Sequence, residues 1–322
     1  MIHCRRLLAA LATLACALVV PAHAQTWPDK PIHFIVSAGP GSSLDTLART
    51  IGDKLKDRLG QPVIVENKPA AGGTVATTEV ARAAPDGYTM LLGFPGPLAF
   101  GPLIQKLPYD VGRDLTPVII TSNQPNVLAV NAQLPVRTLP ELVAYAKANP
   151  GKLNYASVGN GSSSHLVMEL LKSTAGFDAV HVPFNGSPPA VMATVQNETQ
   201  MLFAVMQPLQ PQIQAGKLRA IAVTTAKRFP LFPDIPAIAE TYPGFEAQAW
   251  NGIMVPAATP RPIVTRLNAE IDAILKQPDV VKAMNAQGFD LIGGPPEDFG
   301  RLLKSEVERW TPVIRKLNLK VD

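Results

Sequence analysis

Short apolar runs alternate along this chain with longer stretches in which apolar residues recur every three or four positions. The runs Ile32–Val36, Val63–Glu66 and Thr89–Gly93 have the length and composition of buried strands. In the segment 44–59, between the first two runs, one helical face collects the apolar residues Leu44, Leu47, Ala48, Ile51, Leu55 and Leu59. This alternation of strand and helix predicts an α/β protein built on parallel sheets.

The same alternation returns after a proline-rich middle, whose prolines are typical of rigid turns. We expect further strands at 154–157, 180–182, 201–204 and 218–223, and further helices at 139–148, 165–174, 189–197 and 209–215. From about Pro256 the chain is predicted to be mostly helical, with amphipathic segments at 266–275, 280–287 and 297–316.

The N-terminal segment has the three parts of a cleaved secretory signal. Arg5 and Arg6 precede the apolar stretch Leu7–Val20, and the small-residue site Ala22-His23-Ala24 follows it. We therefore expect residues 1–24 to be a signal peptide and the mature protein to begin at Gln25, in the periplasm. A lipoprotein signal at Cys16 is the alternative, but Thr13-Leu14-Ala15 makes a poor lipobox.

Composition excludes several function classes. Both cysteines, Cys4 and Cys16, fall in the signal, so the mature chain has neither a disulfide nor a thiolate metal site. The remaining histidines lack the spacing of metal ligands, and no metal or cofactor is expected. The formal net charge of +4 falls to +2 without Arg5 and Arg6, and no block of basic residues suggests nucleic-acid binding. Removing 24 of the 322 residues leaves 298, a length typical of two domains.

Two loops rich in serine and glycine follow predicted strands and precede predicted helices. They are Ser37–Ser43 and Val158–Ser164. In open α/β sheets, ligands bind beyond the carboxyl ends of strands, and a helix N-terminus there favours an anion. Two such loops could hold a carboxylate without Arg or Lys. The simpler alternative is that each serine only caps its helix.

Enzyme motifs are weak by comparison. Gly39-x-Gly41 after a strand, with Glu66 ending the next strand, imitates a dinucleotide fingerprint, but Leu44 occupies the third glycine position. No G-x-S-x-G elbow or HExxH motif occurs. Asp45 fits a first-turn complement to the helix dipole better than a general base, and His165 fits a residue that packs its loop. A nucleotide-dependent enzyme remains the remote alternative.

Several segments in order along the mature chain resemble the Bug family, the extracytoplasmic solute receptors of tripartite tricarboxylate transporters. The segments are WPDKPI, SAGPGSSLDTLAR, VIVENKPAAGGTVA, PDGYTMLLG, LNYASVGNGSSSHLVMELL, HVPFNGSPPAVMATVQNE, IQAGKLRAIAVTT, FPDIPAIAE and WNGIMVPAATP. The resemblance implies a two-domain periplasmic-binding-protein fold of the Venus-flytrap type. We expect domain 1 at 25–127 plus 249–322 and domain 2 at 128–248, with hinges near 126–128 and 248–251.

The resemblance also implies the ligand and the partner. Family members hold a carboxylated solute between the domains and deliver it to membrane permease subunits of the transporter. A monomer is expected, because hinge closure needs no second copy. A periplasmic sensor that presents its closed form to a signalling receptor is the alternative that the sequence leaves open.

Carried onto this chain, the family's two ligand loops and their surroundings give a set of candidate ligand-binding residues. They are Ser37, Gly41, Ser42, Ser43, Phe94, Ser157, Asn160, Ser162, Ser163, Phe184, Asn185 and Ala204.

This chain also departs from the family pattern. It has SAGPGSSLD where relatives have a PFPPGGxxD-like loop, and Phe184-Asn185-Gly186 where relatives often have Tyr-Lys-Gly. Ala204 stands where relatives carry an acidic residue. We therefore expect a dicarboxylate with an apolar or aromatic middle, of which terephthalate is an example.

Overall fold

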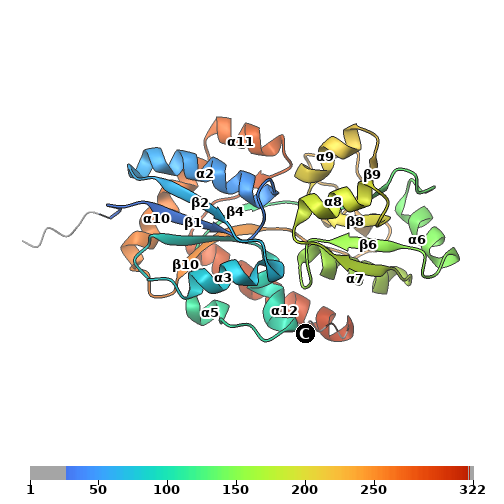
Figure 1. Cartoon of the computed structure of the whole chain (residues 1–322), viewed down its shortest axis with the longest axis horizontal. Helices are drawn as coiled ribbons and strands as arrows, with labels where there is room; N and C mark the ends of the chain where they lie inside the picture. The colour runs from blue at the N-terminus through green and yellow to red at the C-terminus, as the bar shows by residue number, and fades with distance from the viewer. Residues whose placement is uncertain (1–26, 318, 320–322) are drawn as a thin grey trace, which may run out of the picture.

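Two lobes, each a β-sheet covered by helices, make up the computed structural model, which describes residues 27–317 and 319. The lobes lie side by side along the longest axis of the molecule (Figure 1). The expected signal peptide, residues 1–24, lies outside the described residues. Each lobe has helices packed on a sheet, so the α/β prediction is confirmed.

The first lobe contains a six-stranded sheet in the order β11-β4-β10-β3-β1-β2. Its strands are β1 (Ile32–Val36), β2 (Val63–Asn67), β3 (Thr89–Gly93), β4 (Leu115–Asn123), β10 (Asn251–Pro256) and β11 (Asp290–Leu291). Strand β1 pairs in parallel with β2 and β3, whereas β10 is antiparallel to both of its neighbours, β3 and β4.

The second lobe contains a five-stranded sheet in the order β7-β6-β8-β5-β9. Its strands are β5 (Val127–Asn131), β6 (Asn154–Ser157), β7 (Val180–Pro183), β8 (Met201–Ala204) and β9 (Leu218–Val223). Strand β6 is parallel to β7 and β8, and β5 is antiparallel to β8 and β9.

The prediction of parallel sheets is therefore correct for β1–β3 and for β6–β8 but not for the rest of either sheet, and β4, β5, β10 and β11 were not anticipated. Parallel neighbours are joined by a crossover, usually a helix. Strand β5 instead arrives from the end of β4 in the other sheet, and β10 arrives from the second lobe. Both β5 and β10 therefore begin at the end of their sheet that faces the other lobe. Each runs antiparallel to its two neighbours.

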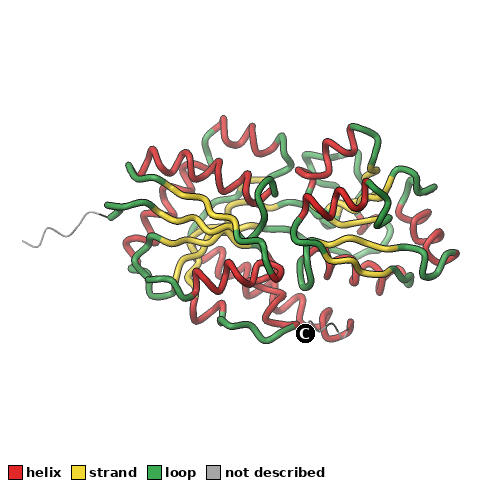
Figure 2. Tube along the Cα trace, viewed as in Figure 1, coloured by secondary structure: helices red, strands yellow, loops and turns green. Residues whose placement is uncertain are grey.

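Helices cover both sheets (Figure 2). The first lobe carries α2 (Ser43–Leu59), α3 (Thr74–Ala81), α4 (Gly101–Ile104), α5 (Val111–Asp114), α10 (Arg261–Leu275), α11 (Pro278–Asn285) and α12 (Pro296–Leu317). The second carries α6 (Leu139–Ala148), α7 (Ser163–Ala175), α8 (Ser187–Val195) and α9 (Met206–Gln214). The short helices η1 (Ala71–Gly73), η2 (Gly96–Phe100) and η3 (Ile238–Glu240) complete the order.

Helix α2 shows how the sequence pattern becomes packing. Leu47, Ala48, Ile51 and Leu55 are all fully buried against the first sheet, as the spacing predicted. Burial of each large side chain contributes roughly 1.5–3 kcal/mol. The helix begins after Ser42, whose hydroxyl accepts from the Asp45 amide, and ends at Gly60, which has the left-handed backbone (φ 71°) of a C-cap. This packing fixes the helix N-terminus at the lobe junction.

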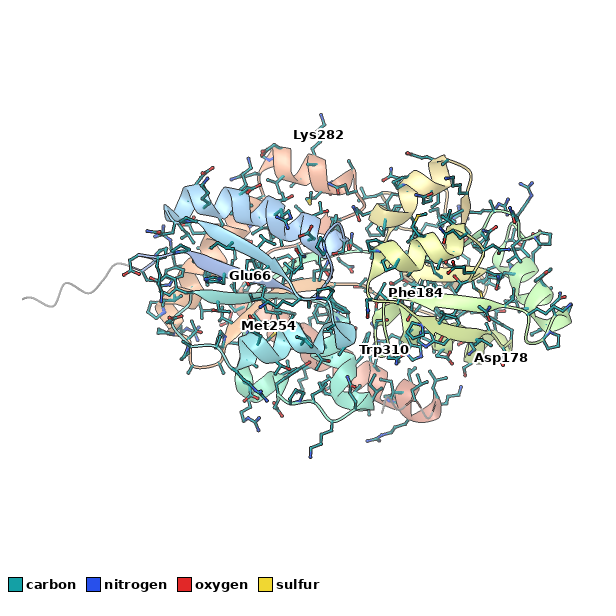
Figure 3. The ribbon with its side chains drawn as sticks, viewed as in Figure 1. Glu66, Asp178, Phe184, Met254, Lys282 and Trp310 are labelled. Carbon is teal, nitrogen blue, oxygen red and sulfur yellow. The ribbon has the colours of Figure 1, made fainter. Side chains whose placement is uncertain are left out.

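The chain crosses between the lobes on two neighbouring segments, 124–126 and 247–249. Gln124 and Ala249 exchange backbone hydrogen bonds of 3.1 and 3.0 Å, and the Ala247 amide donates to the Thr224 carbonyl at 2.9 Å. Helix α12 runs beneath the junction, where its Trp310 packs on Phe100 at 4.8 Å between ring centroids (Figure 3). Within the described ranges, no helix combines the length and apolar composition needed to span a membrane.

Candidate functional site

A cleft of about 410 Å³ lies between the two sheets, where their strand ends face each other. The first sheet contributes residues that follow β1, β2, β3 and β4, and the second contributes residues at or after the ends of β6, β7 and β8. The antiparallel strands β5 and β10 begin at the same two edges. The cleft therefore occupies the position at which open α/β sheets bind ligands.

Five helices of the described chain begin at the cleft wall: α2, α3, α7, α8 and α9. Their first residues or N-caps line it, at Ser43, Gly73, Ser163, Ser187 and Val205. A helix N-terminus carries roughly half a positive charge and several unpaired N–H groups. The cleft therefore collects positive potential from the backbone.

The side chains of the wall add no charge. Among the described residues that line the cleft, there is no Asp, Glu, Lys, Arg or His. An anion that enters would thus meet backbone N–H groups, hydroxyls and amides, and no competing cation or like charge. Hydrogen bonds from neutral donors to a carboxylate are stronger than those between neutral groups. The arrangement is suited to a small carboxylate.

The serines at the starts of α2 and α7 divide into two roles. Ser42 and Ser162 are N-caps: their hydroxyls accept from the amides of Asp45 (3.3 Å) and His165 (3.4 Å). The next residues, Ser43 and Ser163, line the cleft, and their hydroxyls form no hydrogen bond with another described residue. The sequence suggested two roles for the loop serines, helix cap and ligand donor. Each loop contains one serine suited to each role.

Nine of the twelve candidate residues line the cleft. They are Ser37, Ser42, Ser43, Phe94, Asn160, Ser163, Phe184, Asn185 and Ala204. Phe184, labelled in Figure 3, lies on the side of the second lobe that faces the first. Ala204 is only 3% exposed, so the wall is closed and apolar where relatives were expected to carry an acid.

The structure places the other three candidates, Gly41, Ser157 and Ser162, away from the cleft wall. The exposed Gly41 has a positive φ of 75°, and its amide donates to Asp45 at 2.9 Å. The Ser157 hydroxyl is 2.6 Å from His181 Nε2, and the Ser162 hydroxyl donates to the Gly159 carbonyl at 2.6 Å. These residues shape the two loops from behind.

Four amide side chains in the wall escaped the sequence analysis: Gln105, Gln124, Asn126 and Asn251. Gln124 and Asn126 flank Pro125 on the first crossover, and Asn251 begins β10. Gln124 and Asn126 could have been predicted from the sequence, because this pair of amide residues lies beside the hinge expected at 126–128.

The rims of the two lobes touch across the cleft. Gly72, in η1, lies so near the loop after β6 that a Cβ atom on it would be 2.8 Å from the Asn160 carbonyl oxygen. A Cβ on Gly161 would lie 2.6 Å from Ile104 Cδ1 in the first lobe. At Gly72 the neighbouring atom is backbone, so a Cβ would require one rim to shift, whereas at Gly161 the Ile104 side chain could move instead. The rims therefore meet closely in this structure, most tightly at Gly72 and Asn160.

Two stacked histidines support the loop after β6 from behind. The rings of His165 and His181 lie 4.0 Å apart and 5° from parallel. His165 Nδ1 accepts from the Gly161 amide at 3.2 Å, and His181 Nε2 contacts the Ser157 hydroxyl. Burial lowers the pKa of His165, and burial together with the neighbouring His165 lowers the pKa of His181 to about 3. The loop is thus held by neutral imidazoles.

This pair predicts that the folded state loses stability in mild acid. An unfolded histidine takes up a proton near pH 6.5, whereas both folded rings resist it. Their stabilising contribution is therefore complete above pH 6.5 and is lost as the pH falls below it, for His181 down toward pH 3. Between pH 7.5 and 5.5 we expect His181 to lower the free energy of unfolding by about 1 kcal/mol, and His165 to act in the same direction. Urea titrations of the wild type and His181→Asn check this, and an equal fall in both proteins would contradict the assignment to His181.

Comparison with known proteins shows what the chain is similar to. A family model described as "Tripartite tricarboxylate transporter family receptor" matches residues 47–319. The UPF0065 protein in the tcbD-tcbE intergenic region of Pseudomonas sp. (strain P51) is 38% identical over 298 residues, 92% of this chain and 89% of that protein. Protein BugT of Bordetella pertussis is 36% identical over 307 residues, 94% of each chain.

Solved structures agree with the fold. R. palustris Rpa4515 with adipate superposes with a TM-score of 0.88 at 33% identity, covering 91% of this chain and 99% of that one. MatC (Rpa3494) from Rhodopseudomonas palustris with bound malate gives a TM-score of 0.85 at 34% identity, covering 89% and 100%. The expected two-domain binding-protein fold is confirmed.

Proposed function

Because the chain belongs to the tripartite tricarboxylate transporter receptor family, as its resemblance to the Bug proteins indicated, we propose that it captures a dicarboxylate with an apolar or aromatic middle. Terephthalate is an example of this class. The protein acts in the periplasm, as a monomer and not as an enzyme, after residues 1–24 have been removed. It delivers its ligand to the membrane permease subunits of a tripartite transporter.

The observation that carries the proposal is the charge pattern of the cleft. Five helices begin at a cleft wall whose described side chains include no ionisable group. Each N-terminus favours a nearby anion by about 0.3–1 kcal/mol, and by more where the site is partly buried. A cation or a zwitterion would lack a counter-charge here. The adipate bound to Rpa4515 and the malate bound to MatC support a carboxylate.

The apolar middle follows from three residues of the wall. Ala204 offers no polar partner, and Phe94 and Phe184 line the same cleft. A hydroxyl or amino group of the ligand that became buried against Ala204 without a partner would cost about 1–3 kcal/mol. The wall therefore favours a methylene chain or an aromatic ring between the carboxylates.

Capture proceeds by closure of two lobes around the ligand. We take 25–127 plus 249–322 as one lobe and 128–248 as the other, with the paired segments 124–126 and 247–249 as the hinge. A ligand that contacts both lobes shifts the population toward the closed form. The contact between Gly72 and Asn160 forms in that state, and the closed form is the one that docks on the permease.

Thermal unfolding against a ligand panel tests the proposal. The panel is citrate, succinate, glutamate, adipate, benzoate, terephthalate, protocatechuate and NAD. A ligand at about 1,000 times its Kd stabilises the folded state by about 4 kcal/mol, which raises the Tm by several degrees. We expect the largest shifts from adipate or terephthalate. A shift with glutamate or citrate alone would contradict the apolar middle, and a shift with NAD alone would contradict the receptor function.

Ser162 and Ser163, two of the serines in the loop after β6, give a matched pair of variants. Ser163→Ala removes a cleft hydroxyl without a protein partner, so we expect ligand affinity to fall by about 1–2 kcal/mol while the Tm of the free protein stays unchanged. Ser162→Ala removes the N-cap of α7, so we expect a loss of about 1 kcal/mol in folding stability. Calorimetry and urea unfolding of both variants measure the two effects. Wild-type affinity in Ser163→Ala would remove this hydroxyl from the site.

A further inference from the structure

The first crossover carries two buried amide groups that the fold leaves unpaired. Gln124 is 1% exposed and Asn126 is 3% exposed, and both line the cleft. Gln124 Nε2 and Asn126 Nδ2 have no hydrogen-bond partner among the described residues. Buried amide donors are normally paired, because leaving one unpaired is costly. Two such groups on one short segment call for an explanation.

The fold itself uses only the backbone at these positions. Gln124 exchanges backbone hydrogen bonds with Ala249. The Asn126 backbone carbonyl accepts from the Thr224 backbone N–H, and the Asn126 backbone N–H donates to the Thr224 hydroxyl, each at 3.0 Å. Neighbouring amides behave differently: Asn123 Nδ2 donates to Gln248 Oε1 at 2.9 Å, and Asn251 Nδ2 donates to Ser122 at 2.9 Å. The fold therefore does not require a side-chain amide at 124 or 126, and both amides are free to bind a ligand.

Strand order places these amides at the opposite end of the cleft from the serine loops. In the first sheet, Gln124 follows β4 and Ser37 follows β1, three strand spacings apart, or about 14 Å. In the second sheet, Asn126 precedes β5 and Val158 follows β6, two spacings apart, or about 10 Å. Between them lie the ends of β3, β10 and β8. The cleft is thus polar at both ends. Phe94 and Ala204 lie between them, together with Asn251, whose Nδ2 already donates to Ser122.

We infer that Gln124 and Asn126 form a second subsite at the hinge, which binds the far carboxylate of a dicarboxylate whose near carboxylate lies between the serine loops. This inference rests on the proposed function and names the residues that select two carboxylates over one. A primary amide brings two N–H donors without a charge. The subsite therefore binds an ionised carboxylate through neutral N–H donors, as the rest of the wall does. Its position on the crossover links ligand length to hinge closure.

Paired ligands and amide-free variants test the subsite. The variants are Gln124→Met and Asn126→Leu, which keep the approximate side-chain size and remove the donors. Calorimetry compares terephthalate with benzoate and adipate with hexanoate, so that each pair differs in one carboxylate. We expect each variant to bind the dicarboxylate about tenfold more weakly and the monocarboxylate with unchanged affinity. Asn126→Asp, which places a negative charge there, is expected to weaken dicarboxylate binding further.

Asn123→Ala is the control, because its side-chain amide lies next to the crossover, at the end of β4, but outside the cleft wall. We expect it to leave the ratio of dicarboxylate to monocarboxylate affinity unchanged. Should Asn126→Leu fail to fold, Asn126→Ala gives the same readout. Equal losses for both members of a pair, or an unchanged ratio, would overturn the subsite while leaving the receptor function intact. A wild type that binds no dicarboxylate would contradict the proposed function and the subsite together.

Discussion

Ala204→Asp is expected to weaken dicarboxylate binding by about 100-fold, the largest effect of any single substitution in the cleft. Ala204 is 3% exposed and lines the wall at the end of β8, so a new carboxylate there would face the bound anion with little water between them. Two like charges about 5 Å apart repel by about 3 kcal/mol at the effective dielectric of a partly buried site. Calorimetric titration with terephthalate and adipate measures the loss.

Ala204→Asn is the matched control for that prediction, because it has the shape of aspartate without its charge. We expect it to lose less than about tenfold in affinity, since a buried amide costs only what its missing hydrogen bonds cost. Equal losses in Ala204→Asp and Ala204→Asn would mean that size and not charge excludes a polar residue here. In that case the ligand's charge would not lie near β8.

Gly72→Ala is expected to lower ligand affinity about tenfold although it removes no ligand contact. The new Cβ would lie 2.8 Å from the Asn160 carbonyl oxygen across the rim, so the two backbones must shift apart, and we expect this shift to open the lobes. A variant that closes in only a tenth of its molecules binds with a tenth of the affinity. Calorimetry measures the affinity, and small-angle scattering with saturating ligand measures the remaining opening.

Gly151→Ala separates closure from backbone strain. Gly151 has a φ of 74°, close to the 60° of Gly72, but a Cβ there would meet nothing within 4 Å. Both variants therefore pay the cost of a non-glycine residue in the left-handed region. We expect Gly151→Ala to lose some stability and to keep wild-type affinity. If Gly72→Ala also bound normally, the rim contact would have no part in closure.

Local patterns were sufficient to predict the two strand–loop–helix segments that carry the serine loops of the cleft. The apolar stripe of α2 and the serine before it located a capped helix start, and the strand Asn154–Ser157 has the predicted bounds. The loops Ser37–Ser43 and Val158–Ser164 were found because helix caps and strand ends are signalled within a few residues. These features depend on short-range preferences, which a single sequence reveals.

Features that depend on distant segments escaped prediction. Strand β5 has a continuous apolar pattern that is typical of any buried strand, so its antiparallel direction became visible only when the crossover was seen. The same holds for Gln124 and Asn126, whose unpaired amides acquire meaning only against Ala249 and Thr224. Gly72 and Asn160 lie in different lobes, and neither local sequence indicates that they approach each other.

The most direct test of a cleft that binds carboxylates through neutral groups is calorimetry with isosteric ligands that differ only in charge. Terephthalate and adipate are compared with their neutral diamides, terephthalamide and adipamide, on the wild-type protein. We predict one site per chain for at least one diacid and binding at least about 100-fold weaker for its diamide, because charged acceptors form the stronger hydrogen bonds and helix N-termini favour only the anion. Equal binding of a diacid and its diamide, or of neither, would contradict the account.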